Sequence, residues 1–320
     1  MVLTTRHHDG FSLFDSEVSD FTAPKTAAKR DLVAEYVEAC RKRGMGIGFY
    51  YSLLDWRYPA YFSGPEKDPK GWAKLLEYVH TQVRELCTNY SRIDVLWYDG
   101  GWPWDAAAWQ SAKLNAMVRK LQPHILINNR SQLPEDFDTP EQQISAPKDP
   151  KRLWETCMTM NDNWGYSAGD NNWKSTSQLI HNLVRCASGA GNYLLNVGPK
   201  PDGTIPAPSV RRLKEIGKWM KVNGEAIYGS ERCPFRGGMV GLTTARNTTV
   251  YLHVLRWPGK KATIAGIKNK VLSAHLLATE EKVQVIQKGD RLFLRGLPRK
   301  APDLYDSVIV MELDGKPEAC

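Results

Sequence analysis

The chain has 320 residues, of which 42% are hydrophobic and 24% charged, a globular balance that is long enough for one large domain and a small one. The formal net charge is +8, but the basic residues are scattered, which predicts a solvated surface and argues against a nucleic-acid interface. No apolar run reaches the ~18 residues of a membrane span, no secretory signal is visible, and the six cysteines are widely spaced without a CxxC pair, which argues against a disulfide framework or a structural zinc site.

Predicted strands and helices alternate from residue 1 to residue 222. Strands are expected at residues 1–5, 46–52, 93–98, 125–130, 153–158 and 192–199, and helices at residues 28–43, 71–87, 106–121, 176–188 and 210–222. In the helix at 71–87, apolar residues such as Leu75, Val79 and Val83 recur at helical spacing. Each strand is short and apolar and is followed by polar or aromatic residues. Residues 1–230 are therefore predicted to form a parallel β/α barrel with its site at the carboxyl ends of the strands.

The character of the sequence changes near residue 230. Short apolar runs follow at residues 248–255, 262–267, 271–277, 283–287, 291–297 and 307–313, separated by Gly, Pro, Asp and Lys. This spacing predicts a small antiparallel β-sandwich at residues 231–320.

The strongest candidate for a reactive group is Asp99. It ends the apolar run 93–98, and two glycines and a Trp-Pro-Trp cluster follow it. A carboxylate at the carboxyl end of a barrel strand lies where the loops build the site. Trp97, two residues earlier, shares a face of the strand with Asp99. We therefore expect Asp99 to be the reactive centre, with aromatic side chains as apolar walls.

A second polar cluster, His7-His8-Asp9, follows the strand predicted at residues 1–5. Neighbouring histidines in a strand point to opposite faces, which makes joint ligation of a metal ion awkward. The favoured interpretation is hydrogen bonding to a substrate, and no metal site is predicted.

Six motifs occur in order along the chain: HHDGF at 7–11, YYS at 50–52 with DW at 55–56, LWYDGGW at 96–102, NNR at 128–130, WET at 154–156 and GNYLLNVGP at 191–199. Together they resemble the α-L-fucosidases of glycoside hydrolase family 29, and the resemblance covers nearly the whole chain. It implies a retaining exo-glycosidase that hydrolyses terminal α-L-fucosides through a covalent fucosyl-enzyme, with a fucosylated oligosaccharide or glycoconjugate as partner.

The resemblance implies that Asp99 is the nucleophile. Two candidates exist for the acid/base, Glu141 in a loop beyond a strand end and Glu155 in a predicted strand. Glu141 is favoured because the family's acid/base typically comes from such a loop, which leaves Glu155 as an inward structural group or a substrate contact. We expect a hydrophobic wall or the nearby charge of Asp99 to raise the pKa of Glu141.

The fucose pocket implied by the resemblance contains His7, His8, Tyr50, Trp97 and Arg130. Fucose is a 6-deoxy sugar, so its hydroxyls need the donors and acceptors of His and Arg. Its methyl group and apolar face need aromatic surface, which Tyr50 and Trp97 supply.

One departure from the family pattern concerns the first barrel strand and its His-Trp-Gly motif, which the sequence lacks. By that alignment the barrel is expected to lack its first β/α unit and to expose a sheet edge. An alternative function is therefore a non-catalytic fucose-binding protein derived from a truncated barrel, and a third is another retaining glycosidase such as a galactosidase. No strand is followed by GxGxxG, so no cofactor is predicted. A homo-oligomer is possible, and the sequence leaves the cellular location unknown.

Overall fold

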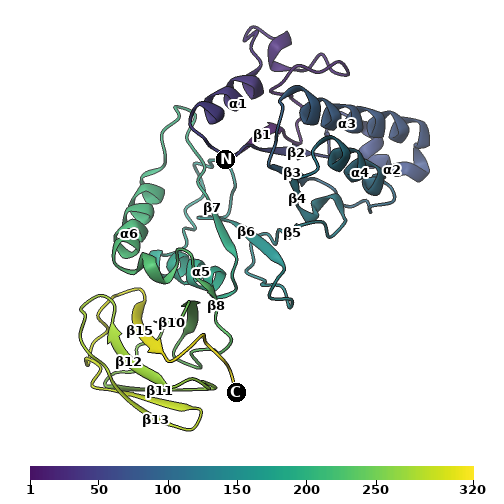
Figure 1. Ribbon diagram of the computed structural model, residues 1–320. Coiled ribbons are helices and arrows are strands. Elements are labelled where there is room, and N and C mark those ends of the chain that lie inside the picture. The colour runs from purple at the N-terminus through teal and green to yellow at the C-terminus, as the bar shows by residue number, and fades with distance from the viewer. The chain divides into compact units, whose positions relative to one another are not determined.

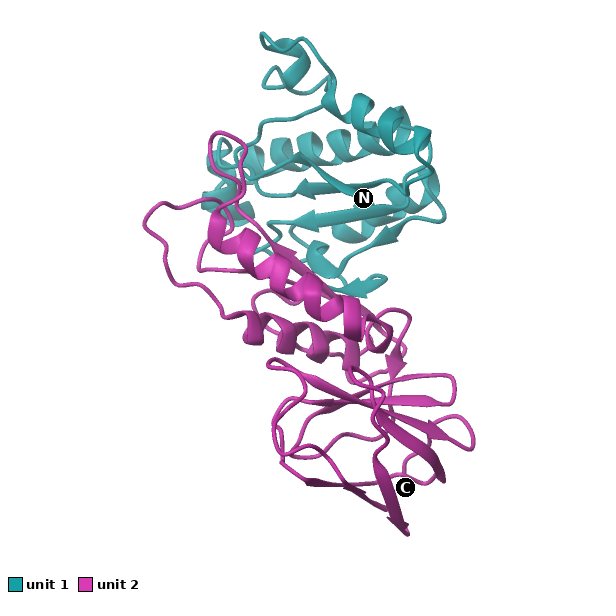
Figure 2. Cartoon of the chain, turned by 90° about the vertical axis from the view of Figure 1, so that its left-hand side faces the viewer, with its two compact units in different colours: residues 1–139 teal, residues 140–320 magenta.

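A computed structural model describes residues 1–320, which divide into two compact units, Met1–Thr139 and Pro140–Cys320 (Figure 1, Figure 2). The domain boundary that the sequence predicts near residue 230 stays a prediction. No helix is both long and apolar enough to cross a membrane.

Unit 1 is built on a parallel sheet of four strands in the order β1-β2-β3-β4. Its strands are β1 (Val2–Arg6), β2 (Gly48–Ser52), β3 (Val95–Asp99) and β4 (Leu126–Ile127), followed by the short strand β5 (Phe137–Asp138). Its helices are α1 (Leu32–Lys42), α2 (Pro59–Lys67), α3 (Pro69–Asn89) and α4 (Ser111–Leu121), with short 3₁₀ turns at Ala23–Lys25 and Asn129–Ser131. Because helices connect neighbouring parallel strands, the β/α alternation predicted for this part is confirmed.

The core of unit 1 lies between one face of this sheet and the helices. Phe49 and Tyr51 of β2, together with Leu96 and Tyr98 of β3, are buried against apolar side chains of α1, α3 and α4. Alternation along a strand then directs the residues between them to the other face. That other face carries Tyr50, Trp97 and Asp99, so the helices stabilise the sheet from one side and leave the opposite side for the candidate site.

Two predicted elements of unit 1 differ from the structure for identifiable reasons. The strand predicted at 125–130 is regular only at Leu126–Ile127. Beyond it, the side-chain amide of Asn128 replaces the backbone in pairing with β3. Its Nδ2 donates to Tyr98 O at 2.9 Å, and its Oδ1 accepts from Tyr98 N at 2.9 Å. Helix α2 was not predicted, because Gly64, with φ +82°, and Pro65 interrupt the helical pattern.

Unit 2 begins with two parallel strands and two helices. The strands β6 (Leu153–Thr159) and β7 (Asn192–Asn196) pair directly, with Glu155 opposite Asn192. Helix α5 (Thr176–Ser188) connects them, and α6 (Ala207–Asn223) follows, ending in a 3₁₀ turn at Gly224–Ala226.

The rest of unit 2 is antiparallel, as predicted for residues 231–320. One sheet has the order β12-β15-β10-β9-β8 and the other β11-β14-β13. The strands are β8 (Glu231–Arg232), β9 (Leu242–Arg246), β10 (Thr249–Val254), β11 (Lys261–Ala265), β12 (Val271–Leu276), β13 (Gln284–Lys288), β14 (Arg291–Arg295) and β15 (Ser307–Leu313). Residues of both sheets, among them Leu252 and Leu292, share one core. On the outer face of the larger sheet, Tyr251 packs with Ile180 of α5 and Trp219 of α6.

Candidate active site

Asp99 is the last residue of β3, and its carboxylate is held by two hydrogen bonds. Arg130 Nη1 donates to Oδ1 at 2.8 Å, and the hydroxyl of Tyr50 donates to Oδ2 at 2.6 Å. Only 8% of Asp99 is exposed. The two donors fix the orientation of the carboxylate, and Arg130 supplies an opposite charge that compensates for its burial.

Arg130 is positioned by the segment that follows β4. Its Nε donates to Thr139 Oγ1 at 3.0 Å, and its Nη2 donates to Thr139 O at 3.1 Å. Thr139 is in turn held by Asn129, whose Oδ1 accepts from both its backbone N–H and its hydroxyl. Three different nitrogens of one planar guanidinium are thus engaged, which leaves Nη1 directed at Asp99.

Four flat side chains form a column beside Asp99. The rings of His7 and Tyr50 stack with centroids 5.4 Å apart and planes 3° apart, and the rings of Tyr50 and Trp97 stack at 5.4 Å and 18°. The guanidinium of Arg130 continues the column 4.5 Å from the centroid of Trp97. These groups come from β1, β2, β3 and β4 or from the residues just after them, so the parallel register of the sheet brings together residues that are far apart in sequence.

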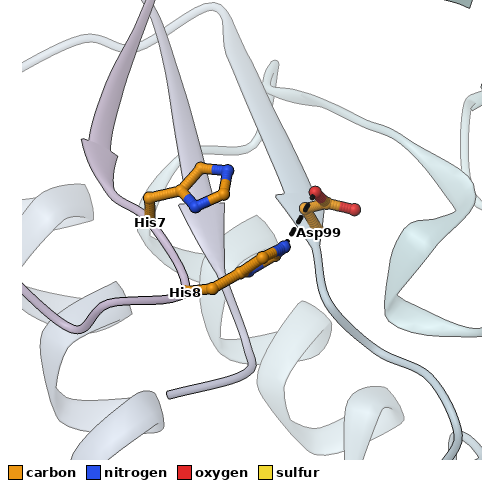
Figure 3. A group of neighbouring side chains, drawn as sticks. All are labelled: His7, His8 and Asp99. Carbon is orange, nitrogen blue, oxygen red and sulfur yellow. Dashed lines mark ion pairs between the residues drawn. The ribbon is translucent and has the colours of Figure 1, made fainter. Parts of the chain in front are cut away.

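His8 also lies next to Asp99, beside His7 (Figure 3). Its Nδ1 is 2.7 Å from Ser52 Oγ, and the hydroxyl of Ser52 donates to Leu54 O at 2.7 Å. Because the single hydroxyl proton of Ser52 goes to Leu54, Nδ1 of His8 must carry its own proton and donate. That tautomer leaves Nε2 as an acceptor, 3.8 Å from Asp99 Oδ2. Burial and the neighbouring His7 lower the pKa of His8 to about 4, so the ring is neutral at ordinary pH.

The prediction that His7 and His8 point to opposite faces is wrong, because β1 ends at Arg6 and both histidines lie in the turn that follows. Their ring centroids are 4.1 Å apart, and ligand atoms of His7, His8 and Asp99 all lie within 4.8 Å of one another. A cation at this position would compete with Arg130 and Tyr50 for the carboxylate oxygens of Asp99. The donor set therefore fits a sugar hydroxyl better than a metal ion, and the absence of a metal stays a prediction.

Gly100 permits the close packing around Asp99. Its φ is +68°, and a Cβ placed on it would lie 2.7 Å from Leu54 Cβ, 3.1 Å from Ser52 Oγ and 3.2 Å from His8 Cε1. A side chain at this position would push on both His8 and its hydrogen-bond partner. The glycine that follows the carboxylate is thus part of the geometry of the site.

A buried ion pair, Arg6 with Asp55, lies close to the site, and no motif in the sequence predicts a role for it. Arg6 and Asp55 are fully buried, with Nη1 to Oδ2 at 2.9 Å, and Nη2 of Arg6 donates to the backbone oxygens of Ser52 and Leu54. The pair holds the end of β1 against the loop after β2, next to Ser52, which ends β2 and is the partner of His8. An arginine at the end of an apolar strand and an aspartate after two leucines were the available signals.

The two candidate acid/base residues belong to unit 2, where both are partly buried. Glu155 lies in β6, as predicted. Glu141 forms a parallel bridge with Cys157 of β6, flanked by hydrogen bonds from Gln142 N to Cys157 O and from Cys157 N to Pro140 O. Bridge partners direct their side chains to the same face of a sheet, so Glu141 shares a face with Cys157. Residues two apart in a strand also share a face, so Glu155 shares it as well. The structure thus brings six of the eight predicted residues together in unit 1, and Glu141 and Glu155 together in unit 2.

Comparison with known proteins identifies the relatives of the chain. A family model for alpha-L-fucosidases matches residues 1–225. The tissue alpha-L-fucosidase of Mus musculus is 33% identical over 279 residues, which cover 81% of this chain and 60% of the mouse protein. The alpha-L-fucosidase of Dictyostelium discoideum is 30% identical over 274 residues, which cover 81% of this chain and 59% of that protein. The chain thus spans about 60% of the length of these relatives.

Solved structures agree with this assignment. Alpha-L-fucosidase isoenzyme 1 from Paenibacillus thiaminolyticus superimposes with a TM-score of 0.83 at 38% identity, covering 98% of this chain and 82% of that one. A trapped covalent intermediate of a family 29 alpha-L-fucosidase from Bacteroides thetaiotaomicron, in complex with 2-fluoro-fucosyl fluoride, superimposes with a TM-score of 0.84 at 28% identity, covering 98% and 78%. The chain therefore belongs to the alpha-L-fucosidase family, glycoside hydrolase family 29.

Proposed function

We propose that the chain hydrolyses terminal α-L-fucosides with retention of configuration, and that Asp99 is the nucleophile. The observation that carries the proposal is a buried carboxylate at the end of a parallel strand, fixed by Arg130 and Tyr50 and flanked by His8. Attack of a carboxylate oxygen on the anomeric carbon forms an ester bond to the sugar while the bond to the leaving oxygen breaks. Family membership and the covalent intermediate trapped in the Bacteroides relative support this chemistry.

The surroundings of Asp99 suit a 6-deoxy sugar. His8 offers a lone pair at Nε2 to accept from a sugar hydroxyl, His7 is exposed beside it, and the positive charge of Arg130 lies against the nucleophile, to which its Nη1 donates. Tyr50 and Trp97 would meet the methyl group and the apolar face of fucose with their ring edges, because their ring faces are stacked within the column. These contacts would orient the anomeric carbon over Asp99.

Glu141 is the proposed acid/base, and Glu155 a substrate contact. Glu141 would protonate the leaving oxygen in the first step and remove a proton from the attacking water in the second, which requires its carboxyl group to stand ~5–5.5 Å from that of Asp99. The attachment of residues 140–142 to β6 supports this role, because it gives a loop residue a fixed backbone. We further propose that the β/α part of the chain forms a barrel around this site, as the strand and helix alternation supports.

Replacement of the nucleophile tests the main assignment. The variant Asp99→Gly should lose turnover of an aryl α-L-fucoside, and azide should restore it by direct displacement, which yields β-L-fucosyl azide. Asp20→Gly is the matched control, because the side chain of Asp20 is fully exposed. Near-full activity of Asp99→Gly would refute the assignment. Binding of L-fucose by the wild-type chain without turnover of any fucoside would instead support the non-catalytic alternative.

A second experiment separates the two acid/base candidates. Without the acid, a substrate with a poor leaving group should slow much more than an aryl fucoside with a good one. Azide should then intercept the fucosyl-enzyme and give α-L-fucosyl azide. We expect both signs for Glu141→Ala and neither for Glu155→Ala. The reverse result would transfer the role to Glu155.

A further inference from the structure

Two large aromatic side chains beside the site are used by no packing core. Trp56 is 57% exposed and Trp102 is 47% exposed. Tryptophan is normally among the more buried residues, so two half-exposed indoles near one carboxylate are unusual for a surface that serves only solubility. Other tryptophans from the same loop as Trp102 behave differently: Trp109 is fully buried, and Trp104 packs against Gly64.

Both exposed rings flank His8. The ring centroid of Trp56 lies 5.7 Å from that of His8, and the centroid of Trp102 lies 6.2 Å from it, almost perpendicular. Nε2 of His8 is 3.8 Å from Asp99 Oδ2. The two indoles, which flank His8, are therefore next to the proposed nucleophile, separated from it by the His8 ring. A sugar attached to a fucose that is bound at Asp99 would therefore lie close to these two indoles.

The backbone under each ring is rigid although the ring itself is exposed. Trp56 N donates to His8 O at 2.8 Å, and the preceding Asp55 is locked in the buried pair with Arg6. The carbonyl of Trp102 accepts from the hydroxyl of Tyr61.

The residues around Trp102 are also held in place. Trp109 Nε1 donates to the neighbouring Gly101 O at 2.6 Å, and Trp104 Nε1 donates to Tyr61 O at 2.9 Å. Rigid backbone with exposed aromatic rings is the arrangement of a preorganised binding surface, because little entropy is lost when a ligand covers it.

We infer that Trp56 and Trp102 form a platform for the sugar to which the fucose is attached, with the apolar C–H face of a pyranose ring lying on the indoles. This inference rests on the proposed function and names its substrate class: a fucosylated oligosaccharide is preferred over a fucoside with a small leaving group. The platform lies outside the contacts that hold Asp99, so it sets the choice of leaving sugar and takes no part in bond cleavage.

The experiment compares two substrates that share the fucose and differ beyond it. α-L-Fucosyl fluoride has a single atom as its leaving group, whereas a fucosylated trisaccharide places a sugar on the platform. For Trp56→Ala and Trp102→Ala, the quotient of kcat/KM for the trisaccharide over kcat/KM for the fluoride should fall ~10-fold, as expected for loss of one aromatic contact. Phe62→Ala is the control, because Phe62 is 64% exposed on α2 of the same unit and should keep the wild-type quotient.

Equal losses on both substrates, or a quotient unchanged from that of Phe62→Ala, would overturn the platform. Trp102→Phe keeps an aromatic face and should recover most of the quotient, which separates a lost contact from a misfolded variant. A binding arm is independent of turnover: saturation-transfer NMR with the unfucosylated disaccharide should show contacts in the wild type that the Trp→Ala variants lose. If the wild type hydrolyses neither substrate, the proposed function fails, and this arm alone decides whether the platform binds a sugar.

Discussion

The orientation and surroundings of Asp99 depend on residues that do not contact it themselves but hold the side chains that do. Ser52 determines the tautomer of His8, Asn129 positions Thr139, and Thr139 orients the guanidinium that reaches Asp99. None of these three supporting residues was assigned a role from sequence, although each is close in the chain to one that was. Ser52 and Asn129 lie inside the motifs YYS and NNR, but their supporting roles become visible only through hydrogen bonds across strands.

The protonation of His8 gives the first prediction. Burial, His7 and Arg6 lower its pKa to about 4, against the opposing effects of Asp99 and Asp9. In NMR spectra, His8 should stay neutral with its proton on Nδ1 down to about pH 4. Between pH 6.5 and 4 the unfolded chain binds a proton at His8 that the folded chain does not, so this group lowers the stability of the fold as the pH falls through that window.

Ser52→Ala supplies the control for this assignment, because it removes the hydroxyl that accepts from Nδ1. The variant should populate the other tautomer of His8 and raise KM for a fucoside more than it lowers kcat. A ring that titrates near its ordinary pKa of 6.5 in the wild-type chain would contradict the account.

Hydrophobic periodicity predicts single helices and strands well, but it does not predict how residues at the ends of different strands meet. The helix predicted at 176–188 coincides with α5, and the apolar alternation after residue 248 matches β10, because repeated burial on one face is written into the sequence. The column of His7, Tyr50, Trp97 and Arg130 could be predicted only as a set of residues at strand ends. Its stacking depends on the register of four strands, which no single segment of sequence contains.

The turn after β3 gives the second prediction. Gly100→Ala and Gly44→Ala both place a side chain at positive φ, +68° and +63°, but nothing lies within 4 Å of a Cβ on Gly44. Gly44→Ala should cost about 1–2 kcal/mol of unfolding free energy through backbone strain alone. Gly100→Ala should cost about 1–3 kcal/mol more, because its Cβ meets Leu54, Ser52 and His8. Denaturant unfolding measures the difference, and equal costs would show that the packing around Gly100 is looser than described.

The larger structural unit, unit 2, contains a buried pair of polar side chains, His253 and Asp306. His253 of β10 and Asp306, just before β15, are fully buried with Nδ1 and Oδ2 2.7 Å apart. Nε2 of His253 is 3.2 Å from the hydroxyl of Thr244, which itself donates to Ala226 O, and Trp219 Nε1 donates to Asp306 O. This network connects the helical layer of unit 2 to the larger sheet.

The third prediction follows from this buried pair. Asp306→Asn should lower the free energy of unfolding by about 3 kcal/mol or more, because it leaves His253 buried without its charged partner. Asp290→Asn, at an exposed position, is the control and should change stability by less than about 0.5 kcal/mol. Thermal unfolding followed by calorimetry compares the two variants. Indistinguishable midpoints would show that the buried pair contributes little to unit 2.

The central claim is that Asp99 forms a covalent bond to fucose, and mechanism-based labelling tests it most directly. Incubation with 2-deoxy-2-fluoro-α-L-fucosyl fluoride should add the mass of one fluorofucosyl group to the intact chain and abolish turnover. Peptide mapping by mass spectrometry should place the label on Asp99. A label on another carboxylate, or rapid turnover of α-L-fucosides to products of inverted configuration without any adduct, would contradict the account.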